Sequence, residues 1–173
     1  MRSLIAKATF PTMNDIASLI AALDAPTVKA RRDAATGLGR SGNPSAVLPL
    51  VRALADPHPG IRREAALALG RLDDAQAVPG LIAALADGDP EVRAGVIAAL
   101  RRLKDRRAVI PLTGCLADRD DRIRAGAAEV LGRLGDPRAI KALTAATADP
   151  FSDVRESASR ALDRIRKKRS PGV

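Results

Sequence analysis

The sequence contains almost no aromatic residues. Phe10 and Phe151 are its only phenylalanines, and it holds neither tryptophan nor tyrosine. Hydrophobic residues nevertheless make up 46% of the 173 positions, so the core must be built from Ala, Leu, Val and Ile. Ala and Leu are strong helix formers, and small side chains let helices approach closely. Because no long β-branched run alternates with polar residues, we expect an all-α protein without a sheet.

Residues that carry chemistry are also scarce. Cys115 is the only cysteine, so no intrachain disulfide is possible, which fits a reducing compartment. His58 is the only histidine and lies in a predicted turn, and no cluster has the composition of a metal site. No glycine-rich phosphate loop, GxSxG or CxxC motif occurs. We therefore expect no catalytic residues, no cofactor and no metal, and interpret the protein as a non-enzyme.

Long apolar segments are missing as well. The apolar run in the N-terminal MRSLIAKATFP is too short for a signal peptide. No later segment approaches the roughly 18 consecutive apolar residues of a membrane span. We therefore expect a cytoplasmic protein that contacts no membrane. The net charge is +9 and the sequence pI about 10.9, which favours an anionic partner and a self-repelling, monomeric chain.

A period of 31 residues runs along most of the chain. One position of the repeat is Leu50, Leu81, Leu112 and Leu143. Another is Asn43, Asp74, Asp105 and Asp136, which are residues that cap helix N-termini well. A fixed period of this length is typical of stacked supersecondary units, so we expect an α-solenoid.

Each repeat predicts two helices. Apolar residues recur at helical spacing in the first helix (Val47, Leu50, Val51, Leu54) and in the second (Ile61, Ala65, Leu69, Leu72). Pro49, Pro79 and Pro111 fall inside first helices, and each removes a backbone donor, so we expect these helices to be bent.

The repeats divide the chain into three parts. We expect an N-terminal arm or cap over residues 1–11, a solenoid of about five helix pairs over 12–166, and a basic tail over 167–173. Thr12 and Asp15 are close to a capping box and predict a helix from Met13 to Leu23.

The repeat resembles the HEAT-like repeat, in the short bacterial form also seen in phycobilin lyase subunits. The residues that carry the resemblance are DPEVRAGVIAALRRLKDRRAVIPLTGCL (Asp89 to Leu116) and the copy DDRIRAGAAEVLGRLGDPRAIKAL (Asp120 to Leu143). It extends over about residues 12–166 and implies a right-handed superhelix whose second helices line a concave binding face. Such repeats serve many functions, so the resemblance is specific for fold rather than for activity.

A first arginine ladder occupies the first turn of the second helices, where the helix dipole disfavours a cation. Its members are Arg31, Arg62, Arg93, Arg124 and Arg155. Four aspartates, Asp56, Asp87, Asp118 and Asp149, each lie six residues before a ladder arginine. Pairing across this turn would relieve both charges, and HEAT-like repeats commonly keep Asp and Arg at this spacing. We interpret the ladder as structural; the first unit has Ala25 at this offset, with Asp24 as a substitute.

A second arginine ladder lies at the C-terminal ends of the second helices. Its members are Arg40, Arg71, Arg102, Arg133 and Arg164, and Arg63, Arg101 and Arg160 extend it. The helix dipole favours a cation there, so stabilisation of helix ends is one interpretation. The other is a basic stripe roughly 40 Å long, given the stacking distance of helices, that binds a partner. Gly95 and Gly126 lie at equivalent positions in the middle of two second helices. They allow either close helix packing or the close approach of a partner.

Three functions remain open at this point. The first is a non-enzymatic scaffold that binds a protein with an acidic surface or segment on the concave face. The second is an accessory subunit of a bilin-lyase-like maturation complex, in which arginines meet propionates or an acidic client. The third is nonspecific binding to the nucleic-acid backbone, which the charge favours. The lack of aromatic residues argues against base stacking.

Overall fold

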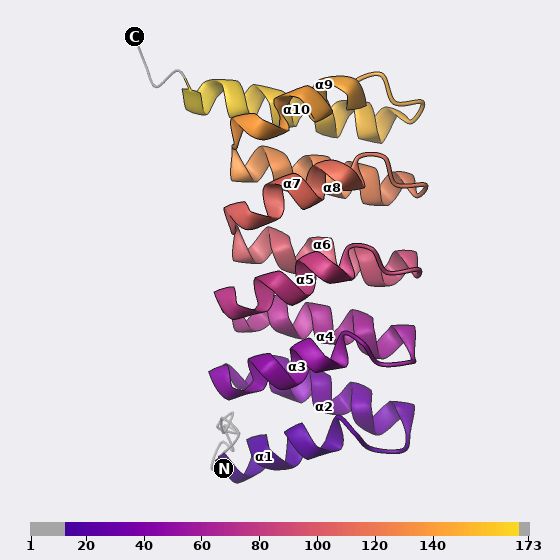
Figure 1. Ribbon diagram of the computed structural model, residues 1–173, viewed down its shortest axis with the longest axis vertical. Coiled ribbons are helices and arrows are strands. Elements are labelled where there is room, and N and C mark those ends of the chain that lie inside the picture. Colours follow the sequence, from indigo (N-terminus) through magenta and orange to yellow (C-terminus); the bar gives the residue numbers. More distant parts are fainter. Residues whose placement is uncertain (1–12, 170–173) are drawn as a thin grey trace, which may run out of the picture.

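The computed structural model describes residues 13–169, with side chains from 15 to 168. The predicted arm (residues 1–11), Thr12 and the last four residues of the predicted tail lie outside the described residues. Within the described part the chain forms five stacked helix pairs and no strand, which confirms the predicted all-α solenoid (Figure 1). Helices α1 and α10 lie at opposite ends of the stack.

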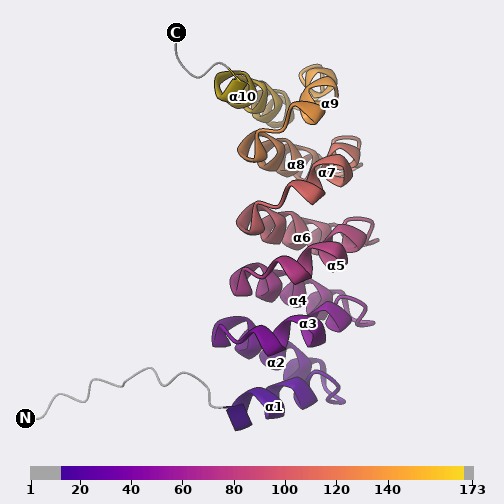
Figure 2. The same ribbon diagram turned by 60° about the vertical axis from the view of Figure 1, so that its left-hand side comes forward.

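The pairs form two layers. The first helices are α1 (Met13–Ala22), α3 (Val47–Ala53), α5 (Val78–Ala84), α7 (Val109–Cys115) and α9 (Ile140–Ala146). The second helices are α2 (Val28–Ser41), α4 (Pro59–Leu72), α6 (Pro90–Leu103), α8 (Asp121–Leu134) and α10 (Ser152–Arg169). Figure 2 shows the stack curving gently, with the second helices on its inner side. This layer is therefore the concave face.

The predicted bend of the first helices takes a particular form. A 3₁₀ turn precedes each of the last four, at Pro44–Ala46, Ala75–Ala77, Arg106–Ala108 and Pro137–Ala139. Each turn begins at the predicted N-cap; the Asp74 carboxylate, for example, accepts a hydrogen bond from the backbone N–H of Gln76 at 2.8 Å. Pro49, Pro79 and Pro111 consequently fall in the first turn of an α-helix, where the missing donor costs little.

The core repeats with the sequence. Leu50, Leu81, Leu112 and Leu143 of the first helices are fully buried. The second helices contribute Leu38, Leu69, Leu100 and Leu131, also 31 residues apart and at most 1% exposed. Each unit thus buries its apolar stripes against its neighbours, as a solenoid requires.

Neighbouring second helices approach closely at three of their four junctions. Gly39, Gly70 and Gly132 face Ala68, Ala99 and Ala161 of the next second helix. A Cβ added to Gly70 would lie 2.8 Å from the Cα atom of Ala99, so only glycine allows this separation. At the remaining junction, α6 with α8, the register places Arg101 and Val130 at these two positions.

The first arginine ladder connects successive units. Arg62 donates from Nε and Nη2 to both carboxylate oxygens of Asp87, 25 residues ahead, at 2.6 and 2.8 Å. The same bidentate pairs are Arg31–Asp56, Arg93–Asp118 and Arg124–Asp149. Each aspartate also accepts a hydrogen bond from the backbone N–H two residues on, as Asp118 does from Asp120.

The predicted pairing across the turn is therefore wrong. Arg93 does not bind the carboxylate of Asp87, six residues before it. It donates from Nη1 to the main-chain carbonyl of Asp87 at 2.8 Å, which turns its other edge towards Asp118 of the next unit. Arg31 likewise reaches Asp56, so no substitution by Asp24 is needed. Arg155, in the last unit, contacts only the carbonyls of Asp149 and Pro150 within the described residues.

Burial and hydrogen bonding together set the pKa values of the ladder carboxylates. The pKa of Asp87 lies below its ordinary value, chiefly because its carboxylate accepts hydrogen bonds from Arg62, and burial opposes the shift. For Asp118, burial is the largest influence and raises the pKa, but the hydrogen bonds from Arg93 and from the backbone more than offset it. These carboxylates are therefore held in the charged form.

Candidate partner-binding surface

The eight arginines predicted to bind a partner differ in how free they are. Four face an acid of the same chain: Arg71 meets Glu64, Arg101 and Arg133 both meet Glu129, and Arg160 meets Glu156. Arg102 donates from Nε to the main-chain carbonyl of Gly70 at 2.9 Å and so links α6 to the end of α4. Arg40, Arg63 and Arg164 are exposed and have no ion-pair partner among residues 13–169.

The structure brings three of these arginines together. Arg101, Arg102 and Arg133 line a recess of about 500 Å³ at the C-terminal ends of α4, α6 and α8, with Lys104 and Asp73. We call this site the basic recess. Four cations and one carboxylate line it, and the shared partner Glu129 lies beside it. The helix C-termini favour cations here, and their clustering creates a positive field that attracts carboxylates.

Lys104 was missed by the sequence analysis. It takes the left-handed conformation after α6, with φ of 51°, at the position that Gly42 and Gly135 occupy in other units. Left-handed backbone costs a lysine energy that glycine avoids. An alignment of the repeats shows the exchange of glycine for lysine and would have drawn attention to it.

A second hollow adjoins the basic recess. It lies between α6 and α8, has a volume of about 140 Å³, and shares Arg101 with the recess. Its walls are mostly apolar: Ala94, Ile97, Ala98, Ile123, Gly126 and Val130. We call it the α6–α8 cleft. Among the four junctions of second helices between residues 28 and 169, it lies at the one where arginine replaces glycine.

Ion pairs bridge the two helices at both ends of the α6–α8 cleft. Arg122 of α8 meets Glu91 of α6 at 3.0 Å, and Arg101 of α6 meets Glu129 of α8 at 3.7 Å. All four side chains are more than one third exposed, so these pairs contribute little stability and exchange readily with solvent or ligand. Gly126 lines the cleft, whereas the space beside Gly95 is filled by Arg63 of the same chain.

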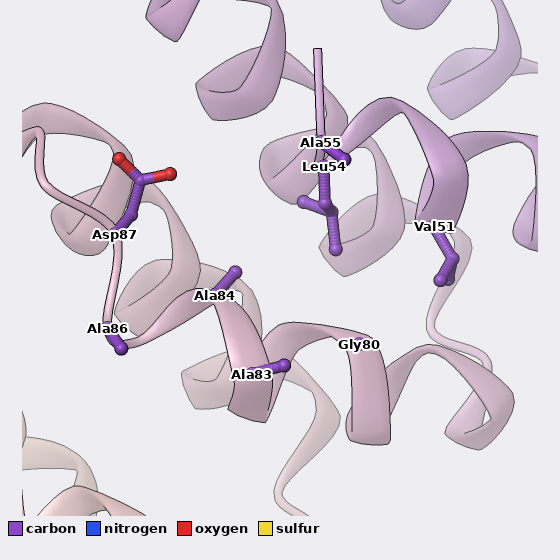
Figure 3. A pocket seen from close by; sticks show the side chains of 8 residues that line it. All are labelled: Val51, Leu54, Ala55, Gly80, Ala83, Ala84, Ala86 and Asp87. Carbon is purple, nitrogen blue, oxygen red and sulfur yellow. The ribbon is translucent and has the colours of Figure 1, made fainter. Parts of the chain in front are cut away.

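Grooves on the other layer recur from unit to unit. Figure 3 shows the one between α3 and α5, where Val51 and Leu54 face Gly80, Ala83 and Ala84. Related grooves lie between α1 and α3 and between α7 and α9, lined by residues at equivalent repeat positions. Their repetition indicates ordinary spacing between first helices rather than a site.

The remaining chemical candidates are accounted for locally. Burial raises the pKa of Cys115 to about 11, and its thiol donates to the carbonyl of Pro111, so the cysteine is not activated. The His58 side chain accepts the backbone N–H of Gly60 and caps α4. Across residues 13–169 no group of three His, Cys, Asp or Glu side chains has a metal-binding arrangement. Within the same range, every helix is too short or too polar to cross a bilayer.

Comparison with known proteins agrees with the repeat and the stack. The HEAT repeats family matches residues 16–89 and 78–163, which together span most of the chain. The chain therefore belongs to the HEAT repeat family. No curated protein matches it.

Solved structures show the same architecture. A structure of the complex of CpcE and CpcF of phycocyanin lyase from Nostoc sp. PCC7120 aligns with a TM-score of 0.76 and 28% identity, covering 99% of this chain and 71% of that chain. An engineered protein aligns with a TM-score of 0.66 and 25% identity, covering 88% and 81%. A designed armadillo repeat protein in complex with the peptide (KR)4 aligns with a TM-score of 0.69 at 17% identity, covering 88% and 82%, and shows the fold alone.

Proposed function

We propose that the protein is a non-enzymatic scaffold that binds an acidic segment of a partner protein on its concave face, centred on the basic recess. The observation that carries this proposal is the convergence of Arg101, Arg102, Lys104 and Arg133 from two neighbouring second helices, opposed by Asp73 alone among the lining residues. Arg102 is held by the Gly70 carbonyl, so part of the recess is preorganised.

Outside the basic recess, the exposed arginines of the second ladder, Arg40, Arg71 and Arg164, would extend the contact. Arg71 and Arg133 are paired with acids of their own chain, and both are partly exposed. Such pairs are weak in water, so a partner carboxylate can replace Glu64 or Glu129 at small cost. Acidic residues of the partner would therefore contact the second arginine ladder along its length, and they would bind most tightly in the basic recess.

A second candidate is an accessory subunit of a maturation complex of the bilin-lyase type. It is favoured by the similarity to the phycocyanin lyase subunits over nearly the whole chain. The same cations would then meet an acidic client protein or the carboxylates of its chromophore. Nonspecific binding to nucleic acid is the third candidate and rests on net charge alone.

The test is a titration of a labelled acidic peptide, followed by fluorescence anisotropy at 50 mM salt. Charge reversal of Lys104 and Arg133 to Glu removes two cations of the basic recess. The matched control reverses Arg52 and Lys141, which are exposed on first helices, and changes net charge equally. We expect the recess variant to lose at least tenfold in affinity and the control less than threefold.

Three outcomes would contradict this scaffold proposal. Equal losses in the two variants would mean that overall charge, not the recess, attracts the peptide. Absence of binding to any acidic peptide would remove the proposal altogether. Binding of duplex DNA at least as tight as that of the peptide, weakening steeply between 50 and 200 mM salt, would favour the nucleic-acid alternative.

A further inference from the structure

The repeat is broken at one junction, and three exchanges contribute. Arg101 stands where Gly39, Gly70 and Gly132 stand in other units, and Val130 stands where the neighbouring helix otherwise offers alanine. Ile97 replaces the alanines found at the equivalent positions 35, 66 and 128. Larger side chains at both contact positions keep α6 and α8 from the approach that glycine allows elsewhere.

The same exchanges give the α6–α8 cleft its chemistry. Ile97 and Val130 supply branched apolar wall, and Ala94 and Ala98 leave room between them. A cavity of about 150 Å³ lined by apolar side chains is large enough to bind benzene. The α6–α8 cleft, at about 140 Å³, therefore has room for one leucine or phenylalanine side chain.

The charged residues beside the α6–α8 cleft indicate the chemistry of the ligand outside the cleft. Arg101 lines both the α6–α8 cleft and the basic recess, so a chain that places an apolar side chain in the cleft continues directly over Arg102, Lys104 and Arg133. Acidic residues on the same segment would meet these cations. A second copy of this chain fits poorly, because its net charge of +9 repels the face.

Building on the proposed function, we propose that the α6–α8 cleft is a specificity pocket that takes one bulky apolar side chain from an acidic partner segment whose carboxylates lie in the basic recess. The charges then attract acidic segments in general, and the cleft selects those that carry the apolar anchor. The pocket exists because the repeat departs from glycine and alanine at this junction.

The experiment measures a selectivity ratio. Two labelled acidic peptides, identical except for a central leucine or glycine, are titrated against the full chain. Burial of one leucine side chain predicts about tenfold tighter binding of the leucine peptide to the wild type. Because both peptides carry the same charge, the ratio is insensitive to changes in the basic recess.

Two variants test where the ratio arises. Arg101→Gly with Val130→Ala restores the glycine–alanine contact and should close the α6–α8 cleft. Ala98→Leu, at a half-buried wall position on α6, fills the cleft from within and leaves every charge in place. We expect the ratio to fall to about one in both variants. The glycine peptide should bind Ala98→Leu as tightly as the wild type, and the double variant more weakly, because Arg101→Gly removes one of the four cations of the basic recess.

The outcomes separate this inference from the proposed function. A ratio near one in the wild type, with both peptides binding, overturns the specificity pocket and leaves the scaffold in place. A ratio that stays near ten in both variants overturns the location. If neither peptide binds, both proposals fail. Self-association of the wild type in sedimentation that Ala98→Leu abolishes would make a second copy the occupant and overturn the proposed partner.

Discussion

Arginines of the first ladder should differ in their contribution to stability, depending on whether a carboxylate of the next unit accepts their hydrogen bonds. Arg93 has the most deeply buried side chain among the four Arg–Asp pairs of the first ladder. Its side chain is 6% exposed, and that of its partner Asp118 is 12% exposed. Replacing it with alanine removes two hydrogen bonds to Asp118 and those to the Asp87 and Gly88 carbonyls. It also leaves the carboxylate of Asp118 without its cation. Breaking such a buried pair costs about 3 kcal/mol.

Arg155 provides the matched control. It donates to the equivalent carbonyls, those of Asp149 and Pro150, and among the residues that the structure describes no carboxylate accepts a hydrogen bond from it. Arg155→Ala should therefore cost roughly 1 kcal/mol, from the loss of hydrogen bonds to neutral acceptors. Urea unfolding followed by circular dichroism measures both variants.

A double-mutant cycle then identifies the partner of Arg93. We expect a coupling of about 2 kcal/mol with Asp118 and less than about 0.5 kcal/mol with Asp87. The reasoning is refuted if Arg93→Ala costs no more than Arg155→Ala, or if the larger coupling is with Asp87, which would restore pairing across the turn.

Three further predictions follow from the same contacts. Because the pKa values of Asp56, Asp87 and Asp118 are lowered by folding, the stability they contribute is complete above their ordinary pKa near 4 and is lost as the pH falls through the lower folded values. The melting temperature should thus be flat from pH 5 to 7 and fall below about pH 4; a fall beginning at pH 6 would contradict this. Lys104→Gly should raise the free energy of unfolding by about 1 kcal/mol, because glycine adopts the left-handed backbone freely. The same change should weaken binding of the acidic peptide severalfold. A loss of stability would show that packing of the lysine side chain stabilises the fold. Cys115, with a pKa of about 11, should resist alkylation in the folded chain at pH 8 and react fully in urea. Rapid labelling of the native chain would contradict this and would mean that the thiol is accessible.

Much of the architecture follows from local sequence pattern. The 31-residue spacing of Leu81 and Asp74 with their copies predicts stacked helix pairs, because each helix must bury the same stripe and start at the same cap. The structure confirms both. The 3₁₀ turns before α3, α5, α7 and α9 were not predicted, because the pattern places the proline but does not say which hydrogen-bond register the chain adopts.

The partners of the ladder arginines could not be predicted from spacing along the chain. Arg93 lies six residues from Asp87 and 25 from Asp118, and only the stacking distance decides which carboxylate its Nε can reach. Three arginines of the basic recess, Arg101, Arg102 and Arg133, were predicted, but the α6–α8 cleft was missed, for a related reason. The predictions from the sequence rest on residues that the repeat units share. The α6–α8 cleft instead arises where Arg101 and Val130 depart from the repeat pattern. Their effect depends on a contact between two units.

The most direct test of the account is hydrogen exchange of the full chain with and without the acidic leucine peptide. We predict that protection increases in the segments 94–103 of α6, with Lys104 after it, and 122–133 of α8, which line the α6–α8 cleft and the basic recess. The first helices should change little, because their grooves belong to the repeat itself. Helix α2 should change little because it lines neither the α6–α8 cleft nor the basic recess. Protection spread evenly over all five units, or concentrated on the first helices, would contradict the claim that the break in the repeat is the binding site.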